Sequence, residues 1–445
     1  MIRILVLTIM GSIFMSTGAL TAKEGKIFPF DYKTFTLENG LKVFVIPTPA
    51  QGLVSYYSVV RTGSRDEFEK GYSGFAHFFE HMMFRGTKKY PGSVYDGLTI
   101  EMGANANAYT TDDYTCYHLS ITKDNLEKVI ELESDRFQNL YYEEDPFKTE
   151  SGAVYGEYRK GKTDPYFVTY EKLYETAFDL HTYKHTTIGF EKDIAAMPKM
   201  YKYSQTFFKR YYRPENVVIV VTGDITFDNV KALIEKYYKD WQKGYVTPLV
   251  EQEPVQAAPR EAYVDYPGKS LPIVALGYKS LAYNPTDRIY VASGLVADLL
   301  FGETSELYQK LVLREQKAQV LFTEFNENRD PNLNIILSMV KDANDIDYIK
   351  KSITDEITKY QSQLVDKNKL AKLKKRMKYS YLMNLDTPDR VAGGLAREIA
   401  LTADIEGVNK YFATLMKVTP EDIREALKKY FTPSRSTTVT MKGTN

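Results

Sequence analysis

The 445-residue sequence contains few cysteines and histidines, which narrows the kinds of site it can form. The single cysteine, Cys116, excludes an intramolecular disulfide and a cysteine-rich zinc knuckle. The 58 basic and 58 acidic side chains cancel, so no net charge attracts the chain to nucleic acid or to an anionic membrane. With 43% hydrophobic and 26% charged residues, the composition is that of a folded protein, and the length predicts two or three domains.

Long apolar runs are also absent beyond the N-terminus. Arg3 precedes an apolar run over residues 4–15, and small residues follow as far as Ala22. This pattern is typical of a secretory signal peptide over 1–22, cleaved after Ala19 or Ala22. The run is shorter than the roughly 20 residues of a spanning helix, although an uncleaved anchor is the alternative. We expect a periplasmic or secreted protein with no membrane span after signal removal.

Strand and helix signals are mixed along the chain. Runs of β-forming residues predict strands at Leu41–Ile46, Val54–Val60 and Val217–Val221. Helical spacing or a lack of breakers predicts helices at Gly74–Phe84, Asp124–Phe137 (with Asp124 as cap) and Phe227–Trp241. This mixture predicts an α+β fold.

Prolines mark a linker near the middle of the chain. Pro248, Pro254 and Pro259 lie among Gln, Glu and Ala, which predicts a linker over 243–262. The linker separates an N-terminal domain, 23–242, from a C-terminal domain, 263–445.

The two domains resemble each other. Lys209–Pro214 and Lys428–Pro433 are similar, are each followed by a β-run, and lie 219 residues apart (428 − 209). Ser73-Gly74 and Ser293-Gly294 lie 220 apart (293 − 73). These offsets predict an internal duplication that gives two similar α/β-sandwich-like halves, each a mixed or antiparallel sheet with helices. Chance similarity of short segments is the alternative.

One motif concentrates metal-binding chemistry. His77-Phe-Phe-Glu80-His81 places two imidazoles and a carboxylate on one helix face, because positions i, i+3 and i+4 lie together. With five His in the chain, such a motif is expected by chance only about 0.006 times. The alternative is a buried helix whose histidines are satisfied by hydrogen bonds.

A catalytic zinc needs a third protein ligand and an open position. Sequence spacing alone does not identify the third ligand, because the chain has 58 acidic residues. Glu150 and Glu157 lie seven apart, on one face of a helix. Taken by itself, such a pair of glutamates more often belongs to a solvent-exposed helix face than to a metal site.

Several segments together resemble a known family. They are Leu37–Leu41, Thr62–Glu67, Gly74–Thr87, Asn107–Thr110, Leu132–Phe137, Glu150–Glu157, Tyr212–Asn216 and Thr222–Asp224. In order and spacing they resemble the pitrilysin (insulinase) family of zinc metallopeptidases, whose motif is an inverted zinc signature, in the short-chain branch with the mitochondrial processing peptidase. The resemblance covers nearly the whole chain after residue 22, strongly in the first half and loosely in the second.

The resemblance implies a zinc endopeptidase that cleaves peptides or unfolded segments and binds one Zn²⁺ per chain. It makes His77, His81 and Glu157 the metal ligands. It makes Glu80 the general base that accepts a proton from the attacking water. Glu150 matches a second carboxylate that supports ligand orientation or catalysis.

Substrate contacts are also implied. Asn107 and Ala108 resemble the edge strand that pairs with the substrate backbone. In the family, an Arg and a Tyr seven residues later grip the substrate carbonyl; here the Arg is Arg314, but Leu321 replaces the Tyr. The alternative role for Arg314 is a surface salt bridge.

The second half has no copy of the motif. At the repeat offset, Ala297, Leu300 and Phe301 replace the two histidines and the glutamate, so no second metal site is expected. The remaining histidines have no family counterpart and are predicted to be structural: His118, His181 and His185.

The resemblance also bears on partners. In the short-chain branch a facing chain completes the substrate chamber and supplies the Arg/Tyr pair. Because Leu321 lacks the hydroxyl, we expect a heterodimer with a homologue that carries both residues, a homodimer being the alternative. Two other functions are possible alternatives. A non-catalytic assembly subunit would not need the intact His77, Glu80, His81 and Glu157. A metal-binding or chaperone module would account for the metal ligands but not for Glu80.

Overall fold

The computed structural model describes residues 26–444. The predicted signal peptide, 1–22, lies outside these residues. Within them, no helix is long and apolar enough to cross a membrane.

The first sheet has six strands and contains all three strands predicted from the sequence. The strands are β1 (Lys33–Thr36), β2 (Lys42–Pro47), β3 (Leu53–Val60), β4 (Asn105–Thr110), β5 (Thr115–Thr122) and β6 (Val217–Gly223). Their order is β1-β2-β6-β3-β5-β4, with β2 and β6 parallel and the other pairs antiparallel. The sheet is therefore mixed. Strand β4 forms one of its edges, and β1 forms the opposite edge.

The second sheet repeats five of these strands in the same order. The strands are β7 (Arg260–Tyr266), β8 (Ile273–Lys279), β9 (Ala318–Phe325), β10 (Leu333–Val340) and β11 (Ser436–Gly443). Their order is β7-β11-β8-β10-β9, with only β7 and β11 parallel. Strands β6 and β11 begin 219 residues apart (436 − 217). The predicted duplication and the α+β class are confirmed. Strand β7 begins inside the predicted linker, at Arg260.

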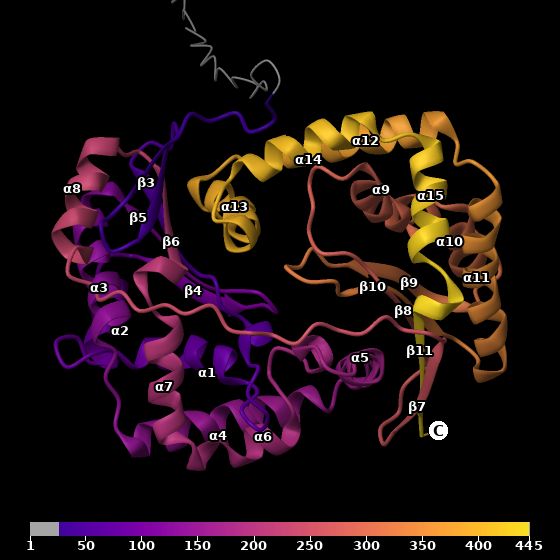
Figure 1. Ribbon diagram of the computed structural model, residues 1–445, viewed down its shortest axis with the longest axis horizontal. Helices are drawn as coiled ribbons and strands as arrows, with labels where there is room; N and C mark the ends of the chain where they lie inside the picture. Colours follow the sequence, from indigo (N-terminus) through magenta and orange to yellow (C-terminus); the bar gives the residue numbers. More distant parts are fainter. Residues whose placement is uncertain (1–25, 445) are drawn as a thin grey trace, which may run out of the picture.

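Helices cover both sheets (Figure 1). Those of the first half are α1 (Phe75–Met82), α2 (Gly92–Glu101), α3 (Leu126–Asn139), α4 (Glu144–Gly161), α5 (Pro165–Ala177), α6 (Glu191–Ala196), α7 (Tyr201–Tyr211) and α8 (Phe227–Tyr238). Those of the second half are α9 (Arg288–Val296), α10 (Glu306–Tyr308), α11 (Ile346–Ser362), α12 (Lys367–Met383), α13 (Pro388–Thr402), α14 (Glu406–Lys417) and α15 (Pro420–Tyr430).

The three predicted helices are present as α1, α3 and α8, but the predicted cap of α3 is wrong. Residues Lys123–Asn125 form a 3-10 turn ahead of α3, so Asp124 lies within that turn. Asn125 takes the cap position, and its side chain makes no capping hydrogen bond to the helix.

The two halves exchange one helix each. Helix α5 of the first half packs on β7, β8 and β11, where Leu173 joins Ile335 and Val439 in one buried cluster. Helix α13 of the second half packs on β3 and β6, where Leu395 joins Val220 in another. Figure 1 shows α13 beside the first sheet and α5 reaching toward the second. Because each sheet is covered by a helix from the other half, the halves stabilise each other.

Candidate metal centre

Helix α1 begins at a glycine that the fold requires. Gly74, at the N-cap position, has φ 93°, in the left-handed region. A Cβ atom there would lie 2.6 Å from the carbonyl oxygen of Ile188. The buried carboxylate of Glu67 accepts hydrogen bonds from the backbone N–H groups of Gly74 and Ala76, both at 2.7 Å. These contacts satisfy two free donors of the first turn and fix where α1 starts.

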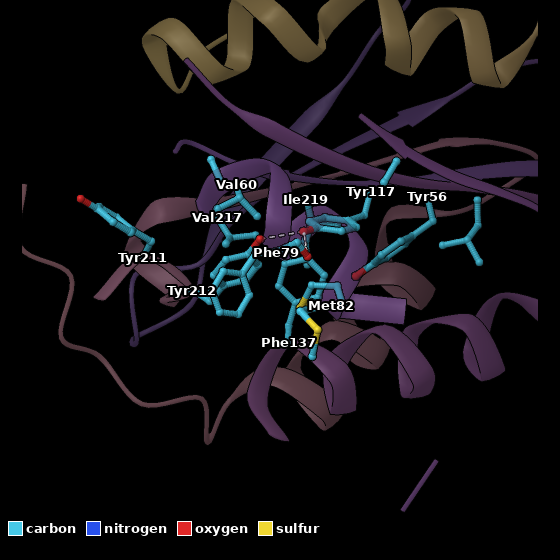
Figure 2. Close-up of a cluster of buried hydrophobic side chains, with 14 of the residues drawn as sticks. Tyr56, Val60, Phe79, Met82, Tyr117, Phe137, Tyr211, Tyr212, Val217 and Ile219 are labelled. Carbon is cyan, nitrogen blue, oxygen red and sulfur yellow. Dashed lines mark hydrogen bonds between the residues drawn. The ribbon is translucent and has the colours of Figure 1, made fainter. Parts of the chain in front are cut away.

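The apolar face of α1 fixes its rotation about its own axis. Its buried residues are Phe75, Ala76, Phe78, Phe79 and Met82, whereas His77, Glu80 and His81 remain partly exposed. Below the helix, the Tyr117 hydroxyl donates to the Phe79 carbonyl at 3.0 Å and lies 2.7 Å from the Tyr212 hydroxyl. Figure 2 shows these hydroxyls meeting beside Phe79 within the aromatic core. The polar side chains of α1 therefore point away from the core together.

Helix α4 brings a third donor group, beside the two histidines, to this face. Phe147 of α4 packs edge-on against Phe78, with ring centroids 5.1 Å apart. Further along α4, Glu157 Oε2 lies 3.7 Å from His77 Nε2 and 3.5 Å from His81 Nε2. Among the described residues, these three form one group of donor atoms within 4.8 Å of one another that could hold a metal ion.

The donor set fits zinc. Tetrahedral zinc with bonds of about 2.0–2.2 Å places its ligand atoms roughly 3.4 Å apart. The distances from Glu157 to the two imidazoles are close to this value. Two imidazoles and one carboxylate also form a common set for catalytic zinc, with a fourth position open.

The surroundings shift the pKa values of the two imidazoles in opposite directions. Burial, with a smaller contribution from His81, lowers the pKa of His77 to about 4. His77 is therefore neutral at pH 7, as a metal ligand must be. The hydrogen bond to Glu150 is the main cause that raises the pKa of His81.

Glu150 lies behind His81. Its Oε1 is 2.9 Å from His81 Nδ1, and its Oε2 accepts from Arg85 Nε at 2.7 Å. Burial acts to raise the pKa of Glu150, but these two partners outweigh it and lower the pKa overall. Since both oxygens are engaged, the placement favours ligand orientation over catalysis for Glu150. Arg85 was not identified from the sequence.

Glu80 is held by the edge strand. The Thr110 hydroxyl, on β4, donates to Glu80 Oε2 at 2.6 Å. Burial raises the pKa of Glu80, and this hydrogen bond opposes the rise. Asn107 and Ala108 lie on the same strand, and β4 pairs only with β5 among the described residues. Thr110 received no role from the sequence, although it lies in one of the matching segments.

Arg314 and Leu321 lie in different surroundings. The half-exposed Arg314 side chain forms an ion pair with Glu306, which is the surface salt bridge weighed as the alternative. Leu321, on β9, is 3% exposed and packs in the core of the second half. Leu321 therefore offers no hydroxyl group at the position that the resemblance assigns to the tyrosine.

The other three histidines lie outside the donor group. His118 stacks on Tyr57, with ring centroids 4.9 Å apart. His181 Nε2 lies 3.0 Å from Asp330 Oδ2, and His185 Nε2 lies 3.7 Å from Glu67 Oε2. Their contacts are those of structural residues.

Two family models and several named peptidases match this chain. Residues 43–190 match the family model "Insulinase (Peptidase family M16)", and residues 201–377 match "Peptidase M16 inactive domain". The zinc protease PqqE of Helicobacter pylori is 30% identical over 419 residues, covering 92% of this chain and 93% of that protein. A probable mitochondrial-processing peptidase subunit beta of Arabidopsis thaliana is 22% identical, covering 89% of this chain and 75% of that protein.

Solved structures share the fold. The crystal structure of a protease from Helicobacter pylori superposes with a TM-score of 0.88 at 28% identity, covering 93% of this chain and 99% of that one. A structure described as a peptidase M16 inactive domain, from Pseudomonas fluorescens, has a TM-score of 0.82 at 16% identity, which shows the fold alone. The similarity therefore extends over both halves.

Proposed function

The chain belongs to the insulinase family of peptidases (peptidase family M16), and from this premise we propose that it is a zinc-dependent endopeptidase. The observation that supports the proposal is that His77 and His81 of α1 converge with Glu157 of α4. Glu80 lies on the same face of α1 as the two histidines. The second half carries Ala297, Leu300 and Phe301 at the repeat offset, so one zinc per chain is proposed.

The proposed reaction is hydrolysis of a peptide bond. His77, His81 and Glu157 would hold a zinc ion, which would supply a Lewis acid to activate water and polarise the peptide carbonyl. Glu80 accepts the proton of the attacking water and passes it to the leaving amine. Through its bond to Nδ1, Glu150 keeps the proton of His81 on that atom, which leaves Nε2 free to bind metal.

Substrate recognition is proposed at the edge of β4. An extended peptide that adds to this edge pairs through its backbone, so recognition tolerates many sequences. Asn107 is exposed there, beside Ala108. We therefore propose peptides and unfolded segments as substrates, with compact folded proteins spared, because a folded chain presents no free strand. Mass spectrometry of a stably folded protein incubated with the enzyme tests this, and efficient cleavage would contradict it.

Export and a partner chain are further parts of the proposal. The N-terminal pattern supports a periplasmic or secreted location. The missing tyrosine at Leu321 supports a heterodimer with a homologue that supplies both Arg and Tyr. Specific activity of the chain alone, compared with the co-expressed pair, tests this; equal activities would contradict the heterodimer.

Zinc content and hydrolysis of a quenched peptide test the function itself. We expect one zinc per chain and hydrolysis that a chelator abolishes and added zinc restores. A zinc-loaded chain that hydrolyses no peptide, alone or with a partner, would favour the non-catalytic assembly subunit instead.

A further inference from the structure

The edge strand β4 reaches the catalytic helix through one side chain. Thr110, the last residue of β4, donates its hydroxyl to Glu80 Oε2 at 2.6 Å. We infer that Thr110 is a positioning residue for Glu80, a role that rests on the proposed peptidase function and extends it.

The bond matters because the hydroxyl adds a side-chain tether to the interaction that the Glu80 carboxylate makes with the Thr110 backbone. The Glu80 side chain has three rotatable bonds and is only partly buried, so an untethered carboxylate would sample several rotamers. Among the described residues, Thr110 is the one whose side chain hydrogen-bonds it.

A second contact makes the tether rigid. On the neighbouring strand, the Tyr117 hydroxyl donates to the Phe79 carbonyl, which fixes the backbone of α1 one residue before Glu80. Tyr117 lies opposite Ala108 in the β4–β5 pairing, and Thr110 lies opposite Thr115. The β4–β5 hairpin thus holds the helix backbone with one side chain and the carboxylate with another.

This arrangement places two functions on one strand. Ala108, where the substrate backbone is proposed to pair, is two residues from Thr110. A substrate that docks on β4 therefore docks on the strand that aims the base. Catalysis gains from such alignment because proton transfer requires the base within hydrogen-bond reach of the attacking water.

Thr110→Val removes the hydroxyl and keeps the shape of the side chain. We expect kcat to fall about 10–100-fold, the usual range for loss of a group that orients a catalytic side chain. KM and the zinc content should remain those of the wild type, and Thr110→Ser, which restores the hydroxyl, should recover kcat. Thr115→Val is the matched control, because the Thr115 hydroxyl donates to the Thr62 carbonyl and not to Glu80.

A measurement without metal or substrate tests the contact itself. The urea midpoint of the metal-free protein is measured for the wild type, Thr110→Val, Glu80→Ala and the double variant. We expect the effect of Thr110→Val on the midpoint to differ between the wild-type background and the Glu80→Ala background. An identical effect in both backgrounds would overturn the inference.

The kinetic outcomes separate this inference from the proposed function. An active wild type whose kcat is unchanged by Thr110→Val, or lowered equally by Thr115→Val, overturns the positioning role alone. A wild type with no chelator-sensitive activity overturns the proposed function, and the role of Thr110 with it.

Discussion

His81 Nδ1 and Glu150 Oε1 lie 2.9 Å apart, on the side of the imidazole opposite the donor group. The second oxygen of Glu150 accepts from Arg85, so the carboxylate is fixed between two partners. Such a carboxylate–histidine pair sets the tautomer and the ring orientation of a metal ligand.

Removing this carboxylate is expected to weaken metal binding. Glu150→Ala should lower zinc affinity about 10–100-fold, because His81 loses the acceptor that orients it. Zinc affinity is measured by competition with a chromophoric chelator. Glu144→Ala, on the same helix but exposed and paired with Lys148, is the matched control. Equal zinc affinity in the wild type and Glu150→Ala would contradict the assigned role.

Glu80→Gln is expected to separate metal binding from catalysis. The variant keeps the three proposed ligands and should retain near-stoichiometric zinc, but kcat should fall on the order of 10²–10⁴-fold with the loss of the base. Glu157→Gln should lose zinc as well. Metal analysis of the purified variants, combined with peptide hydrolysis, checks both. Wild-type hydrolysis by Glu80→Gln would show that another group accepts the proton.

The exchanged helices predict that the halves unfold together. Leu395 of α13 is fully buried against the first sheet, so Leu395→Ala should cost about 2–5 kcal/mol. Trp241, the single Trp, reports on the first half by fluorescence, while circular dichroism reports on the whole chain. We expect the two probes to give one coincident transition in urea, shifted to lower concentration in the variant. Separate transitions would show that the halves are independent.

A buried lysine predicts a pH dependence of stability. Lys279 Nζ lies 3.1 Å from the ring centroid of Phe178 and 3.4 Å from Glu253 Oε1, and burial lowers its pKa to about 7. Between about pH 7 and 10.5 the unfolded state binds more protons, so this residue adds stability as the pH rises and removes it as the pH falls toward 7.

Lys279→Met measures this contribution, because it replaces the titrating group with an apolar one of similar length. The free energy of unfolding of the wild type relative to Lys279→Met should rise by up to about 4 kcal/mol between pH 6.5 and 10. Urea unfolding at a series of pH values gives this difference. Lys341→Met, at an exposed position, is the control and should show no such trend. A difference independent of pH would disprove the assignment.

The amino-acid sequence alone determined the local part of the site. His77, Glu80 and His81 could be placed together because helix geometry fixes which residues share a face. The strands β2, β3 and β6 could be predicted because runs of β-forming residues are a local signal. The duplication could be predicted because its two copies retain similar segments.

The tertiary structure decided which distant groups complete the site. Any of 58 acidic residues could have been the third ligand by spacing, and Glu157 was named only through family resemblance. Glu67, Arg85 and Thr110 lie in matching segments but received no role from the sequence, because each reaches its partner only through the packing of a separate loop, turn or strand. The exchange of α5 and α13 was also hidden, since an apolar face shows that a helix is buried but not which sheet buries it.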